Sequence, residues 1–157
     1  MKKVERYSQP FFYRWYVYVN GKGIQAMSKI LLIDDDAAFL KLLEEYVAER
    51  YRDLTVLTCN DPIKCLASIT NDLDLLLVDL EMPGLDGSKI LSYAVSKGMN
   101  KNRIIILSGH DADYLHKRFP MGSCLAVLNK HDVQQKNVLD MIFKSLQNKT
   151  QSKKDPC

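Results

Sequence analysis

The stretch Lys29–Asp36, KILLIDDD, joins a continuous apolar run to three consecutive carboxylates. A short run of this kind is typical of a strand buried on both faces of a parallel sheet. Apolar residues then recur at helical spacing over residues 36–49, opposite a face rich in lysine and glutamate. Asp36 is a suitable cap for that helix. The stretch therefore predicts a buried strand, an acidic turn and a helix.

The same order recurs along the chain. Further strands are predicted at 54–59, 73–78, 104–107 and 124–128, and helices at 88–97, 111–119 and 133–147. Another helix opens at Asp61-Pro62, where Asp61 can cap and Pro62 fits the first turn. Apolar strands that alternate with helices favour an α/β fold, a doubly wound parallel sheet of five strands covered on both faces. We assign residues 27–149 to this single domain and 150–157 to a polar, frayed tail.

The first 26 residues form an extension of different composition. Their five basic residues and one acid give +4, whereas residues 27–157 are at −1, so the overall +3 does not indicate nucleic-acid binding. The extension is rich in aromatics, but its apolar run over 11–19 is too short to span a membrane. Asn20-Gly21 favours a hairpin. The extension is interpreted as a docking segment, a disordered arm, or a tag or mis-assigned start before Met27.

The cysteines show no metal or redox motif. Cys59, Cys65, Cys124 and Cys157 make no CxxC pair and no Cys/His metal spacing. Cys59 and Cys124 lie in apolar runs, which favours small core residues, and Cys65 is interpreted as core or surface filler. A reducing, cytoplasmic setting is the simplest expectation.

Most of the predicted strands end in a residue that can take part in chemistry. Asp34 and Asp35 follow the first strand, Asp79 the third, Ser108 the fourth and Lys130 the fifth. The carboxyl ends of parallel strands meet at one edge of the sheet. Clustered carboxylates there need a compensating cation, and their oxygens suit Mg²⁺. The set predicts a phosphoryl-transfer site with Asp79 as nucleophile, assisted by positive charge from the metal and from Lys130.

With these residues in this order, the chain resembles the receiver domain of bacterial two-component response regulators, the CheY-like family. The resemblance covers about residues 27–147 and rests on four runs: Ile30–Asp36, Leu76–Gly87, Ile105–Gly109 and Leu128–Lys130. It implies a flavodoxin-like (βα)5 fold. Such a chain is not a conventional enzyme, but it is expected to catalyse its own phosphorylation and autodephosphorylation.

The resemblance also implies roles for the strand-end residues. Asp79 would accept a phosphoryl group from a histidine kinase or a histidine phosphotransfer protein, and Ser108 and Lys130 would contact that group. The Mg²⁺ ligands would be Asp34, Asp35, Asp79 and the backbone carbonyl of Glu81.

Three departures from the family pattern affect these expectations. Val127 stands where an aromatic residue often couples phosphorylation to the output face, and its stiff side chain is unsuited to that movement. His131 replaces the proline that usually follows the lysine. A cis bond without proline costs about 2.5–4 kcal/mol, so a trans bond with an altered reach of Lys130 is the alternative. Glu81 and His110 should flank the phosphoryl group and tune its hydrolysis. For His110, an exposed position without such a role is an equally supported interpretation.

Two other functions compete with phosphoacceptance. A phosphorylation-independent binding adaptor is favoured by Val127 and His131 and opposed by the intact acidic set. An aspartate-nucleophile phosphatase would need a second aspartate at the position of Glu81. About ten residues follow the last helix, too few for a DNA-binding domain. We therefore expect a stand-alone receiver, monomeric or dimerising on phosphorylation, that binds a downstream protein through the 111–119 helix, the fifth strand and the last helix.

Overall fold

The computed structural model describes residues 27–152. The elements are β1 (Ser28–Ile33), α1 (Ala37–Arg50), β2 (Leu54–Cys59), α2 (Pro62–Cys65), η1 (Leu66–Ser68), β3 (Leu75–Asp79), α3 (Gly87–Ser96), η2 (Lys101–Arg103), β4 (Ile104–Ser108), α4 (Ala112–Arg118), β5 (Ala126–Asn129) and α5 (Val133–Ser152), where η marks a 3₁₀ helix. The expected N-terminal extension and its hairpin lie outside the described residues. Within 27–152, no helix combines the length and apolarity that a membrane crossing requires.

The five strands form one sheet in the order β2-β1-β3-β4-β5. All neighbouring pairs are parallel, so every strand ends at the same edge. Ile33 at the end of β1 lies beside Cys59 on one side and Val78 on the other. The chain winds outward in both directions from β1, which is the doubly wound, flavodoxin-like topology. The predicted fold class is therefore confirmed.

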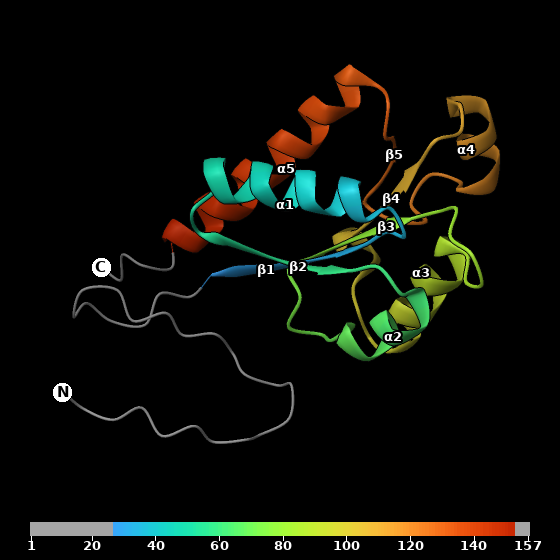
Figure 1. The fold of residues 1–157 in the computed structure, drawn as a ribbon, viewed down its shortest axis with the longest axis horizontal. Coiled ribbons are helices and arrows are strands. Elements are labelled where there is room, and N and C mark those ends of the chain that lie inside the picture. The colour runs from blue at the N-terminus through green and yellow to red at the C-terminus, as the bar shows by residue number, and fades with distance from the viewer. Residues whose placement is uncertain (1–26, 153–157) are drawn as a thin grey trace.

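Helices cover both faces of the sheet (Figure 1). On one face, α1 and α5 contribute Leu40, Val47 and Phe143 to a core with the strands. On the other face, α3 and α4 contribute Ile90 and Leu115 to a second core. Because both faces are covered, every residue of β3 and β4 is buried. This double burial explains why these strands are continuous apolar runs in the sequence.

One helix for which no end was predicted is short, and another is longer than predicted. α2 has only four residues before the chain tightens into η1. α5 continues beyond its predicted end at Gln147 as far as Ser152, so residues 150–152 are helical. The reason is that Thr150 is buried and its hydroxyl lies 2.6 Å from that of Ser28 at the start of β1. This contact joins positions far apart in the chain, so no local pattern predicts it.

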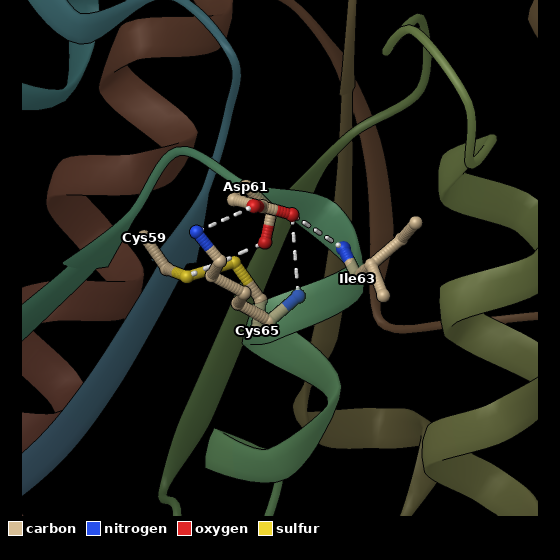
Figure 2. Close-up of a disulfide and its surroundings, with 5 residues drawn as sticks. Cys59, Asp61, Ile63 and Cys65 are labelled. Carbon is tan, nitrogen blue, oxygen red and sulfur yellow. Dashed lines mark hydrogen bonds and ion pairs between the residues drawn. A yellow bond between two sulfur atoms is a disulfide. The ribbon is translucent and has the colours of Figure 1, made fainter.

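The prediction that Cys59 and Cys65 only fill space is wrong, because the two form a disulfide (Figure 2). Cys59 ends β2, and the single turn of α2 brings Cys65 back toward it. Their Cα atoms are 5.8 Å apart, within the usual range for a disulfide. Cys124 is a free, buried thiol, as its apolar run predicted.

Candidate functional site

Three aspartates meet at the carboxyl edge of the sheet. Asp34 follows β1 and is fully buried, Asp79 ends β3 and is 3% exposed, and Asp35 is exposed. One carboxylate oxygen from each lies within 4.8 Å of the other two. Oxygens at this spacing fit Mg²⁺, which binds a few carboxylates together with water and phosphate oxygens. The structure thus brings together the three carboxylates that the sequence singled out.

The turn after β1 holds Asp34 by its backbone and its side chain. The N–H of Asp34 donates to the carbonyl of Cys59 at 3.2 Å. The N–H of Asp36 donates to the Asp34 carboxylate at 3.0 Å. Asp36 caps α1, since its own carboxylate accepts from the N–H groups of Ala38 and Phe39. Asp34 is therefore a fixed member of the cluster, and Asp36 has the capping role that the sequence allowed.

The ammonium of Lys130 lies between two of the carboxylates. Its Nζ is 2.5 Å from Asp34 Oδ2 and 3.1 Å from Asp79 Oδ1. Burial disfavours the charged form of Lys130, but hydrogen bonds to Asp34 and Asp79 outweigh burial and raise the pKa above its ordinary value. No peptide bond among residues 27–152 is cis, so the Lys130–His131 bond is trans, and Lys130 reaches the acidic cluster nonetheless.

The surroundings of Asp79 disfavour the ionised form of its carboxyl group. Burial is the main cause that raises the pKa of Asp79 to about 7, repulsion from Asp34 adds to it, and Lys130 acts in the opposite direction. Without a further cation, this group is therefore partly protonated near neutral pH. A cation bound by the cluster would favour the ionised form, which is the nucleophile.

Sequence reasoning missed the part that Phe39 takes in the site. By its spacing Phe39 belongs to the apolar face of α1, but its ring centre lies 4.8 Å from Lys130 Nζ, a cation–π distance. Both residues line a cavity of about 250 Å³ between α1 and α5. No signal in the sequence distinguishes this ring from an ordinary core aromatic, because its partner is on another element.

A second cluster lies at the end of β4. The buried hydroxyl of Ser108 donates to Glu81 Oε1 at 2.7 Å, and His110 Nε2 is 3.3 Å from the same oxygen. The backbone N–H of His110 also donates to the Ser108 hydroxyl at 3.0 Å. The His110 ring lies 4.2 Å from that of Tyr114 on α4, measured between centres. The three residues that the sequence placed around the phosphoryl group are thus in mutual contact.

Val127 lies in the strand beside the one that ends in Ser108, and Gly87 lies against the backbone of Asp79. Val127 lies beside Ile106 in the sheet, half-buried and packed against the core that includes α3 and α4. Gly87 begins α3, and a Cβ added there would lie 2.3 Å from the carbonyl oxygen of Asp79. Gly87 closes the run Leu76–Gly87, and the structure supplies the physical reason for a glycine there. The backbone of α3 approaches that of Asp79 too closely for any side chain.

A family model described as the response regulator receiver domain matches residues 30–143. The two-component response regulator ARR12 of Arabidopsis thaliana is 29% identical over 121 residues, which cover 74% of this chain and 20% of that protein. The transcriptional regulatory protein CpxR of Klebsiella pneumoniae is 34% identical over 104 residues, covering 59% of this chain and 44% of CpxR. The chain therefore spans less than half the length of these curated relatives.

Solved receiver structures share the fold. The receiver domain of the Francisella response regulator 1452 matches with a TM-score of 0.64 at 24% identity, covering 78% of this chain and 98% of that one. The chemotaxis response regulator CheY4 of Vibrio cholerae matches with a TM-score of 0.62 at 17% identity, covering 75% and 98%. At these identities the likeness concerns the fold, and it agrees with the strand order described above.

Proposed function

This chain belongs to the response regulator receiver domain family, and from that premise we propose that Asp79 is its phosphoacceptor. The donor is the phosphohistidine of a histidine kinase or of a histidine phosphotransfer protein. The observation that supports this most is the placement of Lys130, which contacts both Asp34 and Asp79 at the sheet edge. A nucleophile, a positive charge and oxygens for a metal then meet at one point.

In the proposed reaction, a carboxylate oxygen of Asp79 attacks the phosphorus of the donor. The phosphorus–nitrogen bond breaks, its electron pair stays with the donor imidazole, and an acyl phosphate forms on Asp79. Mg²⁺, held by the three aspartates and the Glu81 backbone carbonyl, would supply positive charge to the phosphoryl oxygens when bound. Lys130 holds the reacting oxygen in place before the transfer and offsets the charge of the phosphoryl group after it.

Glu81 and His110 are proposed to tune the lifetime of the acyl phosphate. Ser108 has one hydroxyl proton, and that proton is donated to Glu81. To donate to a phosphoryl oxygen instead, Ser108 must leave Glu81. His110 contacts the same carboxylate oxygen and so affects how readily this exchange occurs. The hydrolysis step is attack by water on the acyl phosphate, which restores the Asp79 carboxylate and releases inorganic phosphate.

The output is proposed to pass through the face formed by α4, β5 and α5 to a downstream protein in the cytoplasm, with the chain as a monomer or as a dimer formed on phosphorylation. The negative charge added at Asp79 draws Ser108 and the loop after it toward the phosphoryl group. Val127 lies on β5 beside Ile106 of β4 and is packed against the core. The loop after Ser108 would therefore transmit the conformational change that, in this family, an aromatic side chain at the position of Val127 often transmits.

The test is incubation of the purified chain with Mg²⁺ and acetyl phosphate, read by intact mass. We expect one phosphoryl adduct that requires Mg²⁺ and is absent in Asp79→Asn. An adduct that persists in Asp79→Asn would contradict the assignment of the acceptor. The packed Val127 favours a second function, a phosphorylation-independent adaptor, and an unmodified wild type at saturating donor would support it.

A further inference from the structure

The Cys59–Cys65 disulfide lies beside the aspartate cluster without belonging to it. Cys59 is the last residue of β2 and Cys65 the last residue of α2. Figure 2 shows the bridge beside the turn between strand and helix, where the Asp61 carboxylate accepts from the N–H of Ile63. The disulfide therefore fixes the geometry of the β2–α2 turn.

The two sulfur atoms differ in their surroundings. Cys65 is fully buried and belongs to the core that also contains Ile90 of α3 and Leu115 of α4. Cys59 is half-buried, and it ends β2, which is an edge strand of the sheet. Cys59 is thus the more exposed of the two residues, so we take its sulfur as the one that an incoming thiolate attacks, with the sulfur of Cys65 as the leaving group.

Apart from the disulfide, the turn is held by local contacts: Asp61 caps α2, and the N–H of Cys65 donates to the carbonyl of Asp61 at 2.9 Å. α2 is a single turn, and helices this short are not stabilised by their own hydrogen bonds. The ion pair of Lys64 with Asp61 is exposed, where such pairs contribute little. Reduction of the disulfide is thus expected to loosen the end of β2 and the start of α2, while the rest of the sheet is unchanged.

A backbone hydrogen bond joins the turn to the proposed phosphorylation site. The N–H of Asp34 donates to the carbonyl of Cys59 at 3.2 Å, and Ile33 is the register partner of Cys59. Asp34 is the buried carboxylate that contacts Lys130 and contributes to the oxygen cluster. A displacement of Cys59 therefore reaches Asp34 through one direct contact.

We propose that Cys59 and Cys65 form a reversible thiol–disulfide site that controls how firmly Asp34 is held, and through it the rate of phosphorylation of Asp79. The inference rests on the proposed function of Asp79. It also accounts for a disulfide in a protein for which we propose a cytoplasmic setting, because cytosolic disulfides are usually transient and catalytic or redox-sensing. The matching reactant is a dithiol reductant.

The exchange balances in two steps. A thiolate of the reductant attacks the sulfur of Cys59, the bond between the two cysteines breaks, and Cys65 leaves as a thiolate that takes a proton. The second thiol of the reductant, as its thiolate, then attacks the mixed disulfide and releases Cys59, which is protonated in turn. Two electrons pass from the dithiol, which becomes a cyclic disulfide, to the protein. An oxidised dithiol of the same class reverses the reaction.

The experiment compares the full chain in an oxidised preparation and after treatment with dithiothreitol. Alkylation and mass spectrometry should find two more thiols in the reduced form, at Cys59 and Cys65. The reduced form should take phosphate from acetyl phosphate about two- to tenfold more slowly, the effect of weakening one hydrogen bond, and should bind Mg²⁺ more weakly by calorimetry. If the disulfide form binds Mg²⁺ more tightly than the reduced form, saturating Mg²⁺ must in turn favour the disulfide form. In a dithiothreitol buffer, the equilibrium between the two forms should shift toward the disulfide by the ratio of their Mg²⁺ affinities.

Two variants serve as controls. The double variant Cys59→Ser/Cys65→Ser should keep the values of the reduced form under both conditions, whereas Cys124→Ala should retain the full redox response. Equal rates and equal Mg²⁺ affinities in the two wild-type forms would overturn the proposal, as would the lack of a two-thiol difference. If Asp79 is modified in neither form, the proposed function fails, and the Mg²⁺ affinities still decide the redox inference. If the double variant does not fold, the two wild-type forms alone give the answer.

Discussion

The ring of Phe39 closes one side of the Lys130 ammonium, 4.8 Å from the nitrogen, while Asp34 and Asp79 lie at 2.5 and 3.1 Å. An aromatic face attracts a partly desolvated cation and limits where it can move. Phe39 and Lys130 both line a cavity of about 250 Å³. If the ring were absent, the lysine side chain would have room to move away from the carboxylates. We infer that Phe39 positions Lys130 without touching the phosphoryl group itself.

Replacing Phe39 by leucine keeps an apolar side chain but removes the aromatic face. We expect Phe39→Leu to lower the maximal rate of phosphorylation from acetyl phosphate about three- to tenfold, with little change in the donor concentration for half-maximal rate. Phe39→Tyr should restore the rate. Leu43→Ala, on the same helix, is the matched control and should lower stability but not the maximal rate. A wild-type rate in Phe39→Leu would show that the ring only packs.

The raised pKa of Asp79 predicts a pH dependence of stability in Mg²⁺-free buffer. Burial and repulsion from Asp34 raise the pKa of Asp79 to about 7, above its ordinary 3.8, so the folded protein binds a proton that the unfolded chain releases. The stability that this bound proton contributes is fully present at pH values below the pKa of Asp79 in the unfolded chain. It is lost as the pH rises through about 7, the pKa in the folded protein.

Asp79→Asn should therefore increase the free energy of unfolding at pH 8 without Mg²⁺, and should flatten its dependence on pH between about 4 and 7. Urea unfolding at a series of pH values measures both effects. Glu49→Gln, an exposed change on α1, should leave the wild-type profile unaltered. A destabilised Asp79→Asn at pH 8 would mean that the Lys130 contact outweighs burial and repulsion.

The hydrogen bond from Ser108 to Glu81 predicts the lifetime of the phosphorylated form. Glu81→Ala frees the Ser108 hydroxyl for the phosphoryl group, so the acyl phosphate should decay about two- to tenfold more slowly. Decay after removal of the donor, followed by intact mass, gives the rate. His110→Ala keeps the Ser108–Glu81 bond and should change the lifetime less. A shorter lifetime in Glu81→Ala would indicate that Glu81 shields the acyl phosphate from water.

The close approach at Gly87 predicts a large cost for a single methyl group. In Gly87→Ala, the new Cβ would lie 2.3 Å from the Asp79 carbonyl oxygen, so the backbone of one of them must move. We expect a loss of about 2–4 kcal/mol in the free energy of unfolding. Gly109→Ala is the matched control, because the nearest atom to its Cβ would be a His131 side-chain nitrogen at 3.8 Å. Equal stability of the two variants would contradict this account.

The sequence predicted the features that depend on neighbours in the chain. The run Ile30–Ile33 is apolar because β1 is buried on both faces, and the aspartates after it and Asp79 follow from where the strands stop. The convergence of these acids follows from parallel topology alone.

Most of the features that the sequence did not predict depend on contacts between distant segments. The last turn of α5 exists because Thr150 meets Ser28, and no periodicity carries that information. The disulfide is a local contact between cysteines six residues apart, but they form no recognised motif, and only the turn between β2 and α2 brings their Cα atoms to 5.8 Å. The role of Phe39 depends on a lysine that another strand delivers.

The contact of Lys130 with Asp34 and Asp79 has a consequence for the charge of the proposed site, of whose three aspartates two are buried. Three ionised aspartates, one lysine and a bound Mg²⁺ ion, as proposed, sum to zero, so the resting site is electroneutral. An acyl phosphate replaces the single negative charge of Asp79 with about two, which leaves roughly one unit uncompensated. Where the surroundings are partly buried, the electrostatic interaction of this excess charge with nearby dipoles is stronger than it would be in water. If Asp79 is phosphorylated as proposed, the change that a partner would detect starts from about one unit of uncompensated negative charge.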